Sequence, residues 1–191
     1  MFPRRILLED VTPMSARTRL LIALALLLAA LAGCKGEKSN EPEAFSFVVY
    51  PGSRYLPQLT DLTKQAHKVI TPTEEPPPTA IYDTEAPVEQ VAEFYAKSYG
   101  YNTVAPDQTN NLSAAKPPAY FRSGDIATDV RAVVPIAEKM SLKIDTSKAS
   151  GKYKAAEIAA KPNRPRVTVQ RPYFDVSTSQ TVDRTLILMA R

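Results

Sequence analysis

Side chains suited to catalysis are few in this chain. Among its 191 residues there are one cysteine, Cys34, and one histidine, His67. Histidine is the usual acid–base group near neutral pH, and a serine or cysteine nucleophile needs such a base beside it. His67 lies in the segment Gln-Ala-His-Lys, and no Gly-x-Ser-x-Gly motif is present. We therefore interpret His67 as a solvated or capping histidine.

Acidic residues form no recognisable metal or cofactor motif. The aspartates are scattered, and none belongs to the alternating Asp/Asn loop with glycine that calcium prefers. Asp125 and Asp129 are spaced to share a helix face, and we interpret them as charges favoured at the start of a helix. A glycine-rich phosphate loop is also lacking. We expect no metal and no cofactor, although the paired carboxylates of a hydrolase would be visible only in three dimensions.

Cys34 lies in a context with a specific chemical meaning. It follows an unbroken apolar run over residues 20–32, which is 13 residues long. A membrane-spanning helix needs about 20 residues, so this run predicts the core of a signal peptide. Arg17 and Arg19 supply the positive flank on its amino-terminal side.

The segment Leu31-Ala32-Gly33-Cys34 resembles the lipobox of bacterial lipoproteins, a leucine and two small residues before an invariant cysteine. The resemblance implies a diacylglycerol on the Cys34 sulfur, cleavage before Cys34, and often a third acyl chain on the new amino group. Two or more acyl chains anchor a protein stably, because each buried methylene contributes roughly 0.8 kcal/mol. Two alternatives stay open here: an ordinary buried thiol, and an Ala-x-Ala cleavage site for ordinary secretion at residues 30–32.

These features divide the chain into three expected parts. Residues 1–33 are a signal peptide, with translation starting at Met14 because Glu9 and Asp10 suit a basic flank poorly. Residues 34–44 are the lipidated cysteine and a polar, flexible tether, and residues 45–191 are a single domain. Without residues 1–33 the chain has 20 bases and 18 acids, because that segment contains four arginines and two acids. The small positive charge that remains does not favour nucleic acid as a partner.

The pattern of apolar residues predicts an α+β domain. Helices are expected from Pro57, over residues 84–100 with Gly100 as the stop, and from Asp125, where Pro135 would bend or end the helix. Residues 71–78 are a proline-rich loop, and residues 153–159 are ambiguous. Strands are expected over residues 44–50, 80–82, 101–104, 119–122, 140–144, 166–171 and 184–189. This order favours a mainly antiparallel sheet with two or three helices packed on one face.

Two features are candidates for binding a partner. The aromatic segment 170–176 contains Arg171, Tyr173 and Phe174, and it is the first candidate for a contact site. The stretch from Lys139 to Arg171 has nine bases against two acids, and it could face anionic lipid or an anionic polymer. Solubilising charges on hairpin edges are the alternative, and we favour this second interpretation.

The domain also resembles small uncharacterised bacterial envelope domains. The resemblance is carried by Val49-Tyr50-Pro51-Gly52, by Phe94-Tyr95 in an amphipathic helix, and by the closing segment Arg184-Thr-Leu-Ile-Leu. It implies one α+β domain and no particular activity.

The expected function is that of a lipid-anchored envelope protein. We expect the protein to act by binding, as a scaffold or accessory subunit, and not as an enzyme. Its partners would be the membrane, through lipid on Cys34, and an envelope protein or an anionic polymer. Lys35 after the cysteine favours the outer membrane facing the periplasm, because an Asp there would resemble an inner-membrane retention signal. The alternative function is a carboxylate-based hydrolase of cell-wall or sugar polymers.

Overall fold

The computed structural model describes residues 47–110 and 116–191. The predicted signal peptide, Cys34 and the predicted tether lie outside the described residues, so the fold does not test these predictions. Among the helices of the described segments, none is both long enough and apolar enough to cross a membrane.

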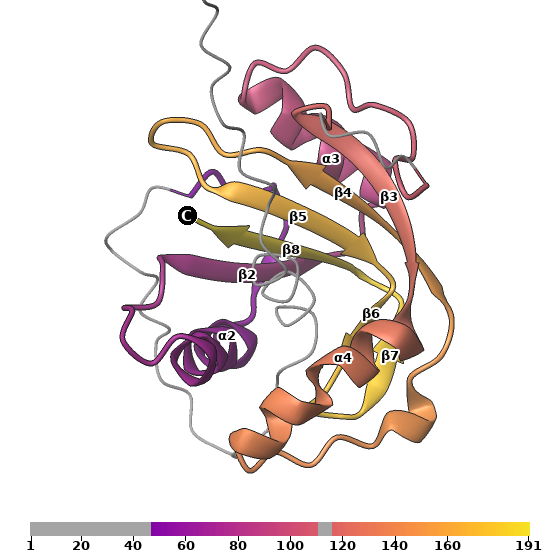
Figure 1. Ribbon diagram of the computed structural model, residues 1–191. Helices are drawn as coiled ribbons and strands as arrows, with labels where there is room; N and C mark the ends of the chain where they lie inside the picture. The colour runs from indigo at the N-terminus through magenta and orange to yellow at the C-terminus, as the bar shows by residue number, and fades with distance from the viewer. Residues whose placement is uncertain (1–46, 111–115) are drawn as a thin grey trace, which may run out of the picture.

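A single antiparallel sheet of six strands organises the domain (Figure 1). Its order is β1-β2-β8-β5-β4-β3, and every neighbouring pair runs antiparallel. The strands are β1 (Arg54–Tyr55), β2 (Thr79–Thr84), β3 (Ala119–Asp125), β4 (Lys152–Ile158), β5 (Arg166–Arg171) and β8 (Thr185–Ala190). A separate hairpin joins β6 (Tyr173–Asp175) to β7 (Gln180–Val182).

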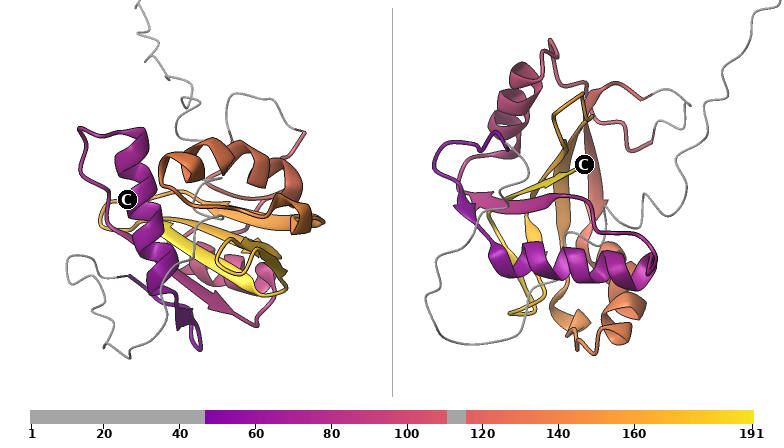
Figure 2. Two further views of the ribbon diagram at one scale, coloured as in Figure 1. Left: turned by 90° about the horizontal axis from the view of Figure 1, so that it is seen from below. Right: turned by 90° about the vertical axis from the view of Figure 1, so that its left-hand side faces the viewer.

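Three α-helices cover the two faces of this sheet: α2 (Pro57–Ile70), α3 (Val88–Ser98) and α4 (Ile126–Lys139). A short 3-10 helix, η1 (Thr146–Lys148), follows α4. One core cluster joins α2 and α4 to the sheet, and a second joins α3 to the opposite face. The views in Figure 2 show α3 on the other side of the sheet from α4. The predicted α+β class is confirmed; two helices share one face, and the third covers the other.

Burial on both faces explains the composition of the central strands. All six residues of β2 are buried, and so are the first five of β8. A strand covered on both sides loses the polar–apolar alternation of a half-exposed strand. At its outer edge β2 is also covered, because Ile81 N donates to Thr60 Oγ1 in α2 (3.0 Å) and Leu56 N donates to the Ile81 carbonyl (2.8 Å).

The helix ends follow the local sequence. Pro57 occupies the first turn of α2, where its missing N–H costs nothing. The Asp125 carboxylate accepts a hydrogen bond from Thr128 N (2.9 Å) at the start of α4, as predicted. Gly100 follows α3 with a φ of +72°, which glycine adopts most readily. Pro135 is accommodated inside α4.

Three predicted strands are wrong over the residues that the structure describes. Residues 47–50, 101–104 and 140–144 lie outside every strand. Their apolar side chains still pack against the core: Phe47, Val49, Tyr50, Tyr101 and Val104 on the α3 side, and Met140, Leu142 and Ile144 on the α2–α4 side. An alternating pattern thus marks burial of alternate side chains, whereas a strand also needs a neighbour to pair with. The ambiguous residues 153–159 supply most of β4.

The outer edge of β3 is covered by the segment that precedes it. Ala105 N donates to the Ala119 carbonyl (2.8 Å), and Phe121 N donates to the Ala105 carbonyl (3.0 Å). Gln108 N then donates to the Phe121 carbonyl (2.8 Å). These bonds satisfy backbone groups that would otherwise template pairing with another chain.

Candidate functional site

The structure places the aromatic residues of the predicted contact site in the interior. Tyr173 is 3% exposed and Phe174 is 1% exposed. Both belong to the core cluster between the sheet, α2 and α4. The expectation that these rings form an exposed contact surface is therefore corrected. Arg171 lies in the same segment but pairs with Asp183, with 2.7 Å from its Nε to Oδ1.

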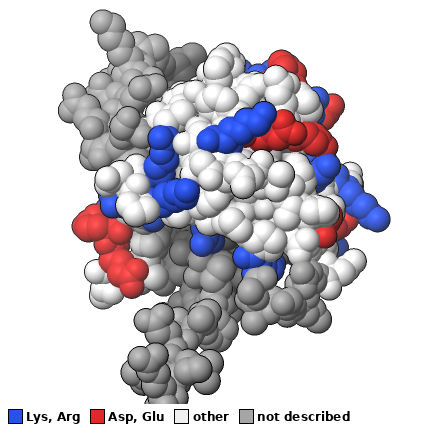
Figure 3. All heavy atoms as spheres, turned by 90° about the horizontal axis from the view of Figure 1, so that it is seen from above, with Lys and Arg blue, Asp and Glu red and all other residues white. Residues whose placement is uncertain are grey.

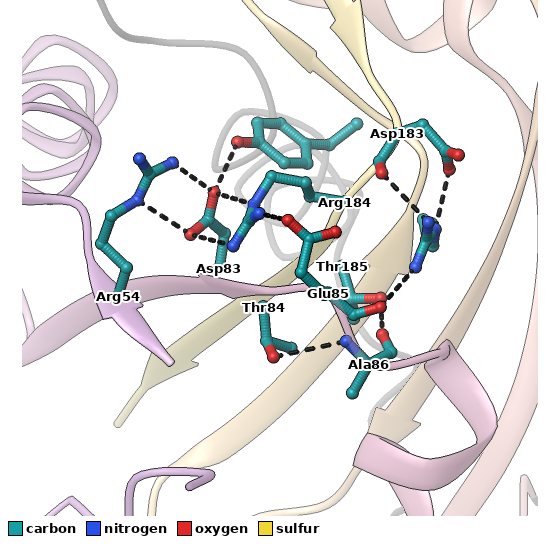
Figure 4. A network of polar contacts seen from close by, with 10 residues as sticks. Arg54, Asp83, Thr84, Glu85, Ala86, Asp183, Arg184 and Thr185 are labelled. Atoms are coloured by element: carbon teal, nitrogen blue, oxygen red, sulfur yellow. Dashed lines mark hydrogen bonds and ion pairs between the residues drawn. The ribbon is translucent and has the colours of Figure 1, made fainter. Parts of the chain in front are cut away.

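A buried carboxylate that sequence reasoning missed lies beside Tyr173. Asp83, near the end of β2, is 0% exposed. Arg54 donates to it through Nε (3.1 Å) and Nη2 (2.7 Å), and Arg184 donates through Nε (2.8 Å). The Tyr173 hydroxyl is 3.3 Å from Oδ2. Figure 4 shows both guanidinium groups turned toward this carboxylate.

This Asp83 network is closed rather than reactive. Arg184 also pairs with Glu85, and Arg171 donates to the Glu85 carbonyl (2.8 Å). The two guanidinium groups and the Tyr173 hydroxyl occupy the acceptor sites of both Asp83 oxygens, so this carboxylate is not placed to take a proton from a substrate. The network compensates a buried charge and ties β1, β2, β8 and the β6–β7 hairpin together. The signal for it in the sequence was a single acid ending the run Ala-Ile-Tyr-Asp.

A second buried network spans β3, β4, β5 and α4. Arg122 donates to Glu157 Oε1 through Nε (2.9 Å) and to the Tyr153 hydroxyl through Nη1 (2.6 Å). Thr168 donates to Glu157 Oε2 (2.9 Å). Burial raises the pKa of the Asp129 carboxyl, which hydrogen-bonds to Tyr153, and burial raises the pKa of Tyr153 itself to about 12. Asp129 thus has two roles: it is the acidic residue in the first turn of α4, and its carboxyl hydrogen-bonds to the buried Tyr153.

His67 is buried as well, contrary to the solvated histidine that we expected. It is 8% exposed on the inner face of α2. Within the described part of the chain its Nε2 has no hydrogen-bond partner. Three or more His, Cys, Asp or Glu side chains do not gather into a possible metal site anywhere in residues 47–110 and 116–191.

Two of the pockets lined by described residues lie near these networks and helices. The smaller, about 180 Å³, lies beside the Asp83 network and includes one carboxylate, Asp175. The larger, about 340 Å³, is a groove between α3, the chain after it and β3. Phe121, Val104 and Ala96 supply its apolar part; its other lining residues are Glu93, Lys97, Asn102 and Thr103. A volume of this size suits part of a ligand or one large side chain.

A ladder of aromatic rings runs along the α3 side of the domain. The rings of Tyr50, Phe94, Tyr95, Tyr99 and Tyr101 follow one another, with centroid separations of 5.1, 5.1, 6.4 and 6.4 Å. Tyr50 N also donates to the Tyr95 hydroxyl (3.1 Å). These contacts hold residues 47–50 on α3 without any sheet pairing.

Basic side chains stand over several of these and neighbouring rings. Arg164 lies 5.3 Å from the centroid of Tyr99, Lys161 lies 4.5 Å from that of Tyr101, and Lys116 lies 5.2 Å from that of Tyr120. Such cation–π contacts orient a cation without neutralising its charge. Strand β4 divides the predicted basic stretch into two parts. Lys139, Lys143 and Lys148 come before this strand in the chain, and Lys161, Arg164 and Arg166 come after it.

We name Lys116, Lys161, Arg164 and Arg166 the basic end of the domain. The Ala159 N donates to the Pro118 carbonyl (2.7 Å) and Lys161 N donates to the Arg164 carbonyl (3.2 Å), so these segments adjoin. Figure 3, seen from above, shows basic side chains spaced over a surface made mostly of uncharged residues, with acidic side chains beside some of them.

The groove and the basic end are two accessible features that could meet a partner, whereas the two buried networks hold the fold together. Each of these two pockets is lined by one carboxylate, Glu93 in the groove and Asp175 in the smaller pocket, whereas a glycoside hydrolase uses a pair. Comparison with known proteins adds no assignment: no family model, no curated protein and no solved structure matches this chain.

Proposed function

We propose that this chain is a bacterial lipoprotein, anchored through Cys34 in the outer membrane and facing the periplasm, that acts by binding an envelope protein. The observation that carries the proposal is the segment Leu31-Ala32-Gly33-Cys34 at the end of a 13-residue apolar run. Cys34 is the only cysteine of the chain. It therefore has no disulfide partner within the chain, and it lies where lipidation requires a thiol.

The tether keeps the domain close to the bilayer. Twelve residues separate Cys34 from Phe47, the first described residue. Fully extended, such a segment spans at most about 45 Å. A domain held within that distance meets membrane-bound partners at a high effective concentration, so modest contacts suffice for binding.

The groove between α3 and β3 is our candidate contact for that partner. Its apolar part ends on the Phe121 ring, and one face of this ring carries Lys154 at 4.4 Å from the centroid. Lys154 is itself held by Glu89 (2.7 Å). An apolar centre with fixed charges around it is the usual composition of a specific contact.

Lipidation is tested by Cys34→Ala. Metabolic labelling with a fatty acid should be abolished, and the domain should leave the membrane fraction. Ser39→Ala, a change of similar size in the expected tether, should keep both properties. Labelling that survives Cys34→Ala would refute the anchor.

Binding through the groove is tested by site-specific photocrosslinking in intact cells. A photoreactive amino acid at Thr103 should give one discrete adduct with a membrane or periplasmic protein. The same amino acid at Thr146, an exposed position in η1, should not. Absence of an adduct at Thr103, or equal adducts at both positions, would count against the groove.

A further inference from the structure

We propose that the basic end docks on anionic lipid headgroups, so that the domain lies with Lys116, Lys161, Arg164 and Arg166 against the bilayer that anchors it. The inference rests on the proposed function, because the anchor is what brings the domain to the membrane. It adds an orientation and a second membrane contact to that function.

The charge of the basic end is uncompensated. Its four bases make no ion pair with any carboxylate in residues 47–110 and 116–191, whereas Arg54, Arg122, Lys154, Arg171 and Arg184 all do. The segments that meet there, 99–105, 116–120 and 158–166, contain no Asp or Glu. The nearest acid along β4, Glu157, is 7% exposed and is neutralised by Arg122. Because no carboxylate of the described residues neutralises these four bases, the electrostatic potential at the surface of the basic end is positive.

The bases are also positioned in advance. Lys116, Lys161 and Arg164 rest on tyrosine rings at 4.5 to 5.3 Å from the centroids. Tyr99 and Tyr101 are in turn fixed by their hydroxyls, which donate to the Pro165 carbonyl (2.8 Å) and the Ala159 carbonyl (3.3 Å). Side chains held in this way lose little further freedom when they meet phosphate groups, so less of the attraction is offset on binding.

The path of the chain joins the tether to this end. Residues 47–50 lie on α3, and the aromatic ladder leads from Tyr50 to Tyr99 and Tyr101, the rings beneath Arg164 and Lys161. The point where the tether enters and the basic end therefore share the α3 side of the domain. A tether of this length allows that side to reach the headgroups.

Membrane lipid is favoured over a soluble anionic polymer by this arrangement. Each basic residue near an anionic surface adds about fivefold to binding, and the attraction falls off within a Debye length of about 8–10 Å. The anchor holds the domain within reach of such a surface at all times, whereas a soluble polymer must be captured from solution. Four bases acting together should then raise the affinity for an anionic surface on the order of several hundredfold over that for an uncharged surface.

The test uses the lipidated protein, purified from membranes and reconstituted in vesicles. Vesicles of phosphatidylcholine are compared with vesicles containing about 30% phosphatidylglycerol, and acylation of each lysine amine is followed by mass spectrometry. In the anionic vesicles Lys116 and Lys161 should react at least about tenfold more slowly. Lys64 and Lys139, on other elements, should keep their rates. The protection should vanish at about 1 M salt, where the Debye length is about 3 Å.

A pair of matched variants makes the result specific. Lys161→Gln with Arg164→Gln should weaken docking about 30-fold and expose Lys116. Lys139→Gln with Lys143→Gln removes the same charge from exposed positions before β4 and should leave Lys116 protected. Near-UV circular dichroism checks that both variants keep the fold.

Three results would overturn the proposal. These are equal reactivity of Lys116 in both kinds of vesicle, loss of its protection in both variants, and protection by soluble dextran sulfate but not by phosphatidylglycerol. The last result would assign the basic end to a polymer. Failure of the proposed function is separate, because it would show as a protein without fatty acid on Cys34.

Discussion

Gly124 and Tyr153 form a contact whose consequences can be worked out in detail. The two residues face each other in the β3–β4 pair. A Cβ atom at position 124 would lie closer than 3.0 Å to the Oη, Cζ and Cε1 atoms of Tyr153. Tyr153 is 5% exposed and packs in the core beneath α4. Gly124→Ala therefore cannot be accommodated unless this ring moves.

The magnitude follows from what the ring would lose. Forcing an extra methyl into a packed core costs about 1–3 kcal/mol. Displacing the Tyr153 hydroxyl also breaks its 2.6 Å hydrogen bond from Arg122, and a hydrogen bond to a charged group contributes about 1.5–3 kcal/mol. We expect Gly124→Ala to lower the free energy of unfolding by about 3–5 kcal/mol, a large part of the 5–15 kcal/mol typical of a domain.

Urea unfolding, followed by far-UV circular dichroism, measures this change as a lower transition midpoint. Gly52→Ala is the matched control, because a Cβ there meets no atom within 4 Å. Its cost should be confined to the left-handed backbone, with a φ of +75°, at about 1–2 kcal/mol. A Gly124→Ala variant within about 0.5 kcal/mol of the wild type would refute the reasoning, because the Tyr153 ring would then be free to move aside.

Two further predictions concern the buried ionisable groups. Asp83→Asn should lower the free energy of unfolding by about 3 kcal/mol, because it leaves two guanidinium groups without their buried partner. Arg54→Ala should lower it by less than about 1 kcal/mol in the same urea assay, because that side chain is 66% exposed. Equal effects of the two changes would contradict the role assigned to Asp83. Burial raises the pKa of Tyr99 and Tyr153 to about 12, so the folded state favours the neutral phenols. Their contribution to the free energy of unfolding is complete below pH about 10. It is lost as the pH rises toward 12. In a spectrophotometric titration, Tyr99→Phe should remove absorbance change near pH 12 and none near pH 10; a loss near pH 10 would show that the ring is not buried.

The helices and the central strands were predictable because their signals are local. Pro57 at the start of α2, the Asp125 cap of α4 and Gly100 after α3 each act through the backbone within one turn. The alternating residues of β5 and the apolar run of β8 are long enough to identify without knowledge of their neighbours. Such features depend on residues a few positions apart, so the linear sequence contains them.

The errors arose where the same pattern serves two structures. Met140, Leu142 and Ile144 alternate as in a strand, yet they pack against the core from an irregular segment after α4. The sequence around Tyr173 and Phe174 is equally typical of an exposed aromatic turn and of a buried core segment. Whether a partner strand or a covering helix is present depends on segments far away in the chain, and the local pattern does not include them.

The sequence by itself determined the α+β class and the positions of the helices, and it predicts the lipid anchor at Cys34, because each of these rests on neighbouring residues. Only the tertiary structure decided which charges compensate one another and which stay free. Asp83 is paired with Arg54, 29 positions away, and with Arg184, 101 positions away, and no spacing rule connects residues so distant. Lys116 joins Lys161 and Arg164 because two antiparallel strands bring their ends together. Charge balance is a property of proximity in space, so the basic end became visible only in the fold.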